Sequence, residues 1–211
     1  MAKMDIAAEP SSAATGRTKK KSGRNTRDLI QAGAFAAIYV VVMLIIVMGS
    51  SIISPILYLA APLTVGAVTG TVYMLAVLKV RSIIPVIVMG GLFLLLAASS
   101  NPLSAGLCAL WVALACIVLV VGKFKSKFVY GLSFVAYNLT MSAPYTMLLI
   151  AKDSFIELSY EYYGSAYSSI IASTPDWIYF GIVIAALVGG ILGALLGGKL
   201  IDKHFKKAGI V

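Results

Sequence analysis

One uncharged stretch near the C-terminus constrains the fold of this chain more than any other feature. It runs from Trp177 to Gly198 and reads WIYFGIVIAALVGGILGALLGG. A helix rises about 1.5 Å per residue, so this stretch can cross a hydrocarbon core of about 30 Å. Trp177 and Tyr179 stand at its start, where amphipathic rings favour the membrane interface, and Lys199 follows its end. The stretch therefore predicts a transmembrane helix.

Small residues recur every four positions along this predicted helix. The row is Gly181, Ala185, Gly189, Gly193 and Gly197. Within lipid the hydrophobic effect does little to drive helices together, so association relies on close packing through small side chains. We expect the row to form a helix-packing seam against neighbouring helices.

The composition indicates that most of the chain lies in a membrane. Of its 211 residues, 60% are hydrophobic and 12% are charged, which is too apolar for a soluble domain. The net charge of +9 does not indicate nucleic-acid binding, because the basic residues lie at segment ends rather than among aromatic residues on one face. We therefore predict a polytopic all-α membrane protein of one compact domain, with the lipid bilayer and not nucleic acid as its partner.

Hydropathy divides the chain into six predicted transmembrane helices. They cover about residues 28–48, 55–78, 83–98, 103–121, 128–150 and 177–203. Pro62 predicts a kink in the second helix, where a freed carbonyl could face a cavity. Residues 1–27 are polar and basic and predict a disordered cytoplasmic tail. The outer loop 151–176 exceeds the usual length of a helix connection, which is typical of a functional segment or a lid.

The basic residues predict the orientation of the bundle. Every Lys and Arg except Lys152 lies in the N-terminal tail, in residues 79–81 and 123–127, or in the C-terminal segment. The turns near residues 50 and 100 carry no charge, and the long loop carries Asp153, Glu157 and Glu161. Cytoplasmic segments of membrane proteins carry an excess of Lys and Arg. Six spans with both termini in the cytoplasm fit this alternation.

Energy-coupling and catalytic residues are missing from the apolar segments. These segments contain no Asp, Glu, Lys, Arg or His, which argues against a proton-coupled carrier, a pump or a voltage-gated channel. Sodium coupling through backbone carbonyls stays open. The one histidine, His204, follows the last helix without a catalytic or metal-binding motif. Residues 193–199 fit the spacing of a phosphate loop, but they lie late in an apolar helix and no Ser or Thr follows. We expect no enzyme activity, no cofactor and no metal, and we expect any ATP use to belong to a partner.

A neutral polar and aromatic set in the outer half of the bundle forms the candidate substrate site. Its members are Asn101, Trp111, Tyr137, Asn138, Tyr145 and Tyr179. An amide near mid-membrane must bond to protein, water or a ligand, so Asn138 either links helices or contacts substrate. Core packing is the favoured interpretation of Trp111, and Tyr137 and Tyr145 could serve either purpose. The long loop adds four tyrosines that either cap a pocket or rest at the lipid interface: Tyr160, Tyr162, Tyr163 and Tyr167.

Two phrases near the ends of the chain resemble a known family. The first, RDLIQAGAFAAIYVVVM, begins at Arg27, and the second, KLIDKHFKKAGIV, ends the chain. With six helices, both ends inside and a long outer loop before the sixth helix, the region from Thr26 to Val211 resembles the substrate-binding S component of energy-coupling factor (ECF) transporters. The terminal phrases look most like the Trep_Strep group of such components.

This resemblance implies a transport subunit in a prokaryotic cell membrane. S components capture vitamins or other trace nutrients outside the cell and dock on a transmembrane coupling subunit, which is bound to two ABC ATPases. Docking in the family uses small residues of the first helix in an A-x-x-x-A pattern. That pattern maps to Ala32 and Ala36, beside a second small pair, Gly33 and Ala37. The resemblance therefore predicts a substrate-capture subunit of an ECF-type importer, with its ligand in the outer half.

Two other functions stay open on the sequence. A stand-alone facilitator or sodium-coupled secondary carrier would also lack ATP motifs, although no clear internal repeat supports the inverted halves typical of such carriers. A membrane scaffold or a membrane enzyme with unrecognised chemistry is the third possibility. Copurifying ATPases would favour the importer over both.

Overall fold

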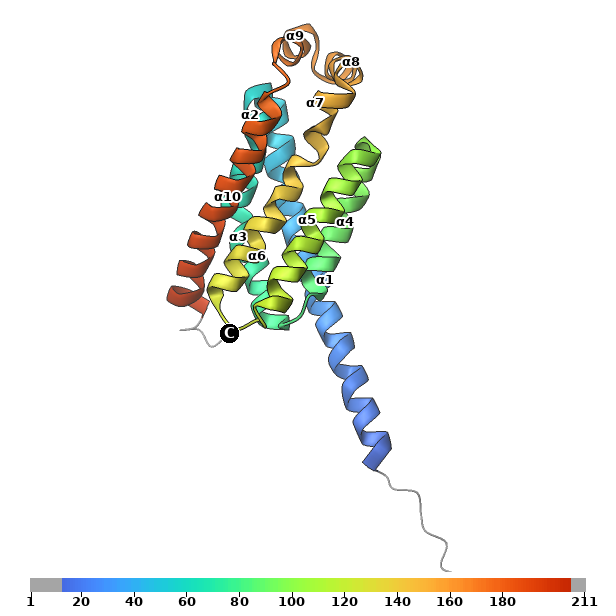
Figure 1. Cartoon of the computed structure of the whole chain (residues 1–211), viewed down its shortest axis with the longest axis vertical. Coiled ribbons are helices and arrows are strands. Elements are labelled where there is room, and N and C mark those ends of the chain that lie inside the picture. The colour runs from blue at the N-terminus through green and yellow to red at the C-terminus, as the bar shows by residue number, and fades with distance from the viewer. Residues whose placement is uncertain (1–12, 206–211) are drawn as a thin grey trace, which may run out of the picture.

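The computed structural model describes residues 13–205, and the side chains of residues 26–203. Within this part of the chain the structure is helical and contains no strand (Figure 1). In chain order the elements are α1 (Ala13–Ile53), α2 (Pro55–Leu59), α3 (Ala61–Val80), α4 (Ile84–Ser100), α5 (Pro102–Val121), α6 (Lys127–Asn138), η1 (Leu139–Ser142), η2 (Pro144–Thr146), α7 (Met147–Ile150), α8 (Lys152–Tyr163), α9 (Ser165–Ser173), α10 (Ile178–Leu200) and η3 (Ile201–Phe205).

Helix starts follow from proline and from small polar caps. A proline stands in the first turn of α2, α3, α4 and α5, where its missing N–H is not needed for an internal bond. The side chains of Ser54, Asn101 and Ser126 accept a bond from a backbone N–H and cap α2, α5 and α6. The predicted bounds 83–98 and 103–121 therefore come within two residues of α4 and α5.

Among the described residues, four helical segments are long and apolar enough to cross a membrane: Thr26–Ile53, Ala61–Val80, Pro102–Val121 and Ile178–Lys203. Lys127–Ile150 adds a fifth when it is taken with Lys152–Tyr163, from which it is bent by 103°. The helix α4, Ile84–Ser100, is apolar but shorter. The structure therefore supports a helical bundle with four to five spans, and the six-span topology stays a prediction.

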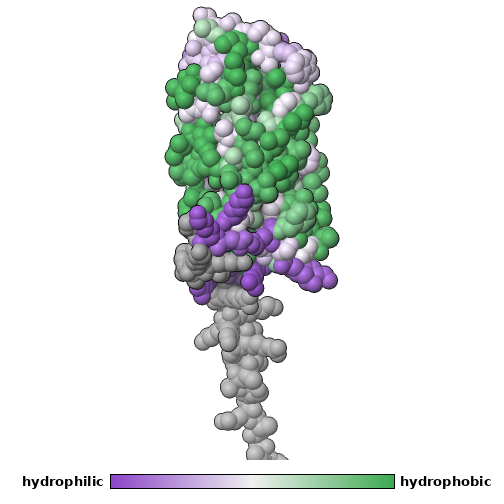
Figure 2. Space-filling view, turned by 90° about the vertical axis from the view of Figure 1, so that its left-hand side faces the viewer, coloured by the Kyte–Doolittle hydropathy of each residue, from purple (hydrophilic) through white to green (hydrophobic). Residues whose placement is uncertain are grey.

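The surface of the bundle is an apolar band with different ends (Figure 2). The end that holds the α3–α4 and α5–α6 turns and the C-terminal end of α10 carries most of the described basic residues (Figure 1). We call it the basic end, after Lys79, Arg81, Lys123, Lys125, Lys127, Lys199 and Lys203. The opposite end is covered by α8 and α9, and we call it the capped end. This separation is the one that the sequence predicted, and the cytoplasmic placement of both termini stays a prediction.

Two segments differ from what the sequence predicted. The helix α1 begins at Ala13, inside the stretch expected to be a disordered tail, and it projects from the basic end (Figure 1). Ala, Lys and Arg are good helix formers, so an apolar span can continue outward as a polar helix. Residues 1–12 lie outside the described part. The long outer loop is folded as the short helices α8 and α9, because its apolar side chains pack on the end of the bundle.

The closest helix pair in the bundle is α3 with α10, and glycine makes it possible. Gly189 and Gly193 on α10 are buried against Gly66 and its neighbours on α3, and Gly197 lies against Gly70. A Cβ on Gly189 would lie 2.5 Å from the carbonyl oxygen of Leu63, closer than real Cβ contacts allow. The structure thus places three residues of the predicted seam in one interface. The other two, Gly181 and Ala185, lie nearer the capped end, outside this close contact.

The fifth predicted helix, 128–150, corresponds to the helical segment Lys127–Ile150, but this segment is not a continuous α-helix. The helix α6 ends at Asn138, and the 3₁₀ turns η1 and η2 follow before α7. Pro144 has no N–H and cannot occupy the interior of an α-helix without losing a bond, so the segment changes to tighter turns there. The predicted kink at Pro62 is also present, as a break between α2 and α3 at Ala60.

Candidate binding cavity

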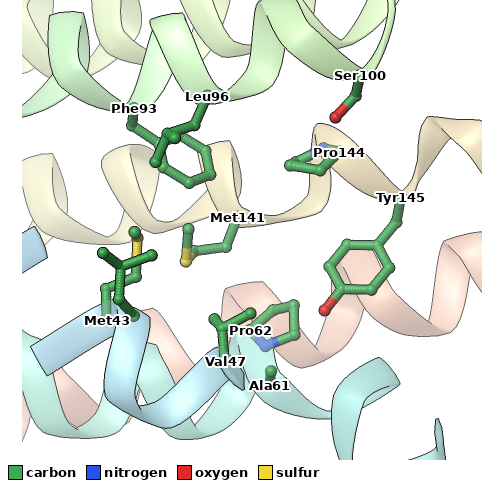
Figure 3. Close-up of a pocket in the computed structure, with 11 residues that line it drawn as sticks. Met43, Val47, Ala61, Pro62, Phe93, Leu96, Ser100, Met141, Pro144 and Tyr145 are labelled. Atoms are coloured by element: carbon green, nitrogen blue, oxygen red, sulfur yellow. The ribbon is translucent and has the colours of Figure 1, made fainter. Parts of the chain in front are cut away.

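A cavity of about 190 Å³ lies where these two broken helices face each other (Figure 3). Three residues from α1, two from α3, three from α4 and three from the broken helix line it: Met43, Leu44, Val47, Ala61, Pro62, Phe93, Leu96, Ser100, Met141, Pro144 and Tyr145. The lining is apolar apart from the Ser100 and Tyr145 hydroxyls. Backbone that leaves the helical pattern inside a membrane is tolerated where it borders a cavity, as it does here.

Tyr145 supplies a hydrogen bond at the first break, between α2 and α3. Because Pro62 lacks an N–H, it cannot donate to the carbonyl of Tyr58 four residues earlier. The Tyr145 hydroxyl donates to this carbonyl instead, at 2.6 Å. The rings of Tyr58 and Tyr145 also lie 5.0 Å apart. The bond ties the two broken helices together at the wall of the cavity.

Asn138 links α6, α3 and α10 beside the cavity. Its Nδ2 donates to the carbonyl of Pro62 at 3.2 Å and to that of Ala186 on α10 at 2.6 Å. The side chain is fully buried. Of the two interpretations that the sequence left open, the structure provides the interhelical hydrogen bond, which satisfies the amide nitrogen.

Polar atoms without partners gather around the break in the fifth helix. Tyr137 Oη, Asn138 Oδ1 and Thr140 Oγ1 are buried and have no hydrogen-bond partner among the described residues. Ser104 Oγ on α5 is in the same condition. Buried polar atoms are normally satisfied, by protein, by water or by ligand. Tyr39 Oη on α1 is the fifth such atom among the described residues. Three of the five belong to residues 137–140, so the break is the place where water or a polar ligand group is expected.

An aromatic cluster under α8 and α9 covers the cavity from the capped end. Tyr145, Leu148, Ile171 and Ile182 form its buried centre, and seven other apolar residues pack around them: Tyr58, Leu59, Phe155, Ile156, Tyr167, Ile178 and Tyr179. Burial, with smaller effects from Tyr58 and Tyr163, raises the pKa of Tyr167 to about 12, so its hydroxyl stays protonated at neutral pH. The cluster separates the cavity from the polar surface of the cap.

Of two polar links in this cap, the first joins the start of α8 to the segment after α9, and the second joins α8 to the bundle. Lys152 Nζ donates to the Thr174 carbonyl at 2.6 Å and pairs with Asp176 at 3.1 Å. The Tyr163 hydroxyl contacts the Ser51 hydroxyl at 3.1 Å, joining the end of α8 to α1. Both links are partly exposed, so the cap is held by few polar bonds and by its apolar underside.

The structure places one of the six candidate substrate residues, Tyr145, on the cavity wall and Asn138 beside it. Tyr137 is buried in the core, with its ring 5.6 Å from that of Tyr39 and 5.0 Å from that of Tyr73. Asn101 caps α5 and bonds Thr146, Trp111 is half-buried on α5, and Tyr179 packs in the aromatic cluster. Ligand contact by any of the six stays a prediction.

The small residues proposed for docking divide between two environments. Ala32 and Ala36 are fully buried within the chain, where α1 packs against its own bundle. Gly33 is half-buried with open space around its Cα, and Ala37 is exposed. A partner could therefore reach the second small pair in this conformation but not the first. Docking itself stays a prediction.

Sequence reasoning missed most of the cavity wall. Met43, Val47, Phe93 and Met141 are ordinary apolar residues of predicted membrane helices. The usable signal was the pair of prolines inside apolar segments, Pro62 and Pro144, because proline forces backbone irregularity that must be satisfied by neighbours. The described residues contain no group of three His, Cys, Asp or Glu that could hold a metal.

The fold and the cavity define a class of protein: a helical integral membrane protein with several apolar spans and an apolar cavity between its helices. A family described as "Hypothetical bacterial integral membrane protein (Trep_Strep)" has a model that matches residues 26–207, and the chain belongs to this family. A search of the curated proteins and a search of the solved structures found no match.

Proposed function

We propose that this chain is the substrate-capture subunit of an ECF-type importer, which binds a vitamin-like or other trace nutrient outside the cell. The observation that carries the proposal is the capped apolar cavity at the meeting point of two broken helices. Discontinuous helices are a recurrent way of building substrate sites in membrane transporters. The resemblance of the two terminal phrases to S components supplies the importer assignment.

The lining of the cavity fits a small and largely apolar ligand. No charged residue lines it, and two hydroxyls with the nearby unpaired polar atoms offer hydrogen bonds. A volume of about 190 Å³ is below that of typical ligand sites, at about 300–1,000 Å³, so the ligand is small or the cavity expands when the cap opens.

The proposal assigns ATP use to partners. In this account a coupling subunit contacts α1 through Gly33 and Ala37, and two ABC ATPases bind the coupling subunit. Replacing both residues by Leu adds bulk to a surface that has room for it. The double variant is therefore expected to keep its fold and lose its partners.

The test is a pull-down of the tagged full chain from its native membrane in mild detergent, read by mass spectrometry. The expected result is recovery of two ABC ATPases and a helical coupling subunit, with loss of all three in the double variant. Gly106→Leu on α5 is the matched control, since Gly106 is exposed and a Cβ there meets nothing within 4 Å. A partner-free protein, under conditions that preserve known membrane complexes, would contradict the importer assignment.

A stand-alone facilitator or sodium-coupled carrier is the second candidate, and the broken helix favours it specifically. Unwound backbone carbonyls hold sodium in secondary transporters, and the break adds two unpaired side-chain oxygens, Asn138 Oδ1 and Thr140 Oγ1. Flux of a nutrient by the purified chain alone in liposomes, driven by a sodium gradient, would support this candidate. Flux only with the ATPases and ATP would reject it.

A further inference from the structure

A second hollow lies on the outside of the bundle, in a groove between α6 and α10 near the basic end. The two helices lie side by side, and both carry lysines at this end (Figure 1). The groove has a volume of about 530 Å³ and shares no residue with the central cavity. Its lining is Met74, Lys127, Phe128, Gly131, Leu132, Val135, Ile191, Ala194, Leu195, Gly198, Lys199 and Asp202.

The groove is apolar along its length and positively charged at its mouth. Small residues, Gly131, Ala194 and Gly198, leave room between the larger side chains of the walls. At the mouth Lys127 pairs with Asp202. Among the residues whose side chains the structure describes, Lys199 has no ion-pair or hydrogen-bond partner. The mouth therefore carries one net positive charge.

A third hollow, of about 590 Å³, meets the groove at Lys127. It is lined by Leu78, Arg81, Phe124, Lys125, Ser126, Lys127 and Tyr130, with three cations and no acidic residue. The first of the two hollows is the apolar groove, and the second is a basic pocket next to it. An occupant that fills both must be apolar at one end and anionic at the other.

The backbone around the basic pocket is held in an unusual conformation. Arg81, Lys123 and Phe124 have φ angles of 50°, 51° and 54°, the left-handed region that favours glycine. Arg81 occupies the position after α3 where glycine is the common residue. The Tyr130 hydroxyl donates to the Phe124 carbonyl at 2.6 Å and fixes the second turn. Arg81 and Lys123 thus occupy backbone positions that would favour glycine. Of the three residues with positive φ, Arg81 and Phe124 line the pocket.

We propose that the α6–α10 groove binds an anionic phospholipid from the leaflet on the basic side. One acyl chain lies along Leu132, Ile191 and Leu195, and the phosphate lies between Lys127, Lys199 and the basic pocket. A lipid is favoured over a water-soluble protein because most of the lining belongs to the apolar band, where such a protein does not reach, and the pull-down below distinguishes it from a membrane partner. Basic pockets between membrane helices bind the head groups of anionic lipids by this combination of charge and burial.

The experiment uses the full chain in nanodiscs that contain equal amounts of phosphatidylglycerol and phosphatidylcholine with identical acyl chains. Lipids retained by the protein are identified by native mass spectrometry. The wild type is expected to retain phosphatidylglycerol preferentially. Lys127→Gln and Lys199→Gln are each expected to lower this preference about fivefold, as a lysine near an anionic surface contributes on that order.

A second set of variants tests the groove without changing charge. A Cβ on Gly198 meets nothing within 4 Å, so Gly198→Leu fills the groove while the backbone keeps its place. This variant is expected to lose retention of both lipids alike, with an unchanged melting temperature. Lys123→Gln and Gly91→Leu, at residues that line neither hollow, are expected to behave as the wild type.

Two outcomes overturn the proposal. One is equal retention of both lipids by the wild type, or a preference that survives in both lysine variants and in Gly198→Leu. The other is a pull-down in which the lysine variants lose a protein partner while lipid retention is unchanged, which would make the basic end a protein interface. The lipid result is independent of which nutrient the central cavity binds.

Discussion

At the scale of single residues, the bundle compensates for the break at Pro62 with side chains from the other broken helix. Tyr145 satisfies the Tyr58 carbonyl that Pro62 leaves without a donor, and Asn138 bonds the Pro62 carbonyl itself. Both bonds are made by the segment that Pro144 interrupts. The segment around Pro144 therefore supports the break at Pro62, while its own Thr140 carbonyl accepts from the Ala143 N–H at 3.0 Å.

Tyr145→Phe is expected to destabilise the protein by about 1 kcal/mol, because it removes the partly buried hydrogen bond to the Tyr58 carbonyl. The measurement is the apparent melting temperature of the purified chain in detergent, which should fall by several degrees. Tyr162→Phe removes an exposed hydroxyl from the cap and serves as the control. Equal melting temperatures for the two variants would show that the Tyr145 bond contributes little.

The sequence indicated that Asn138 and Tyr145 matter, but it did not indicate which groups they bond. Asn138 and Tyr145 stand out because an amide and a phenol are costly in a membrane without a partner. Tyr58 does not stand out, since its importance lies in a backbone carbonyl and depends on a proline four residues later. The apolar wall residues, such as Phe93 and Met141, have the composition of any membrane helix.

At the scale of elements, glycine contacts fix the position of α10 against α3. Gly193 lies against the Gly66 backbone and the Phe134 ring, whereas Gly181 meets only the end of the Ile178 side chain. One small-residue row thus contains both a tight interface and an open surface. A four-residue spacing predicted the row, but the sequence did not show where the partner helix ends along it.

Gly193→Ala is expected to weaken the α3–α10 interface, because a methyl group there would collide with backbone that cannot move aside. We expect a loss of about 1–3 kcal/mol, seen as a lower melting temperature and faster proteolysis. Gly181→Ala is the matched control, and its better helix propensity is expected to leave stability equal or slightly higher. A Gly193→Ala protein as stable as the Gly181→Ala protein would contradict this packing.

Hydropathy, together with prolines and helix-capping residues, predicted most of the elements. The elements that were predicted wrongly or missed have physical explanations. The bounds of α4 and α5 follow from prolines and from the Asn101 cap. The break after Asn138 was missed because a window average does not distinguish an α-helix from 3₁₀ turns of equal hydropathy. The helices α8 and α9 were missed because they are short and mix polar with apolar residues, which become a buried face only against the bundle.

At the scale of the whole molecule, the cap and the basic end lie at opposite ends of the long axis of the described bundle (Figures 1 and 2), and the cavity lies between them. This order suits a protein that admits a small molecule at the capped end and is anchored at the other. The proposed function depends most on the cavity, since the cap and the proposed partners act on the molecule that the cavity binds.

The central claim is tested by Val47→Phe, which adds an aromatic ring to the cavity wall. Val41→Phe on the exposed face of the same helix is the control. Both proteins and the wild type are purified from their native membrane, and bound small molecules are identified by mass spectrometry. We predict one nutrient that copurifies with the wild type and with Val41→Phe and is absent from Val47→Phe. The same molecule on all three proteins, or no molecule on the wild type, would contradict the claim that this cavity captures substrate.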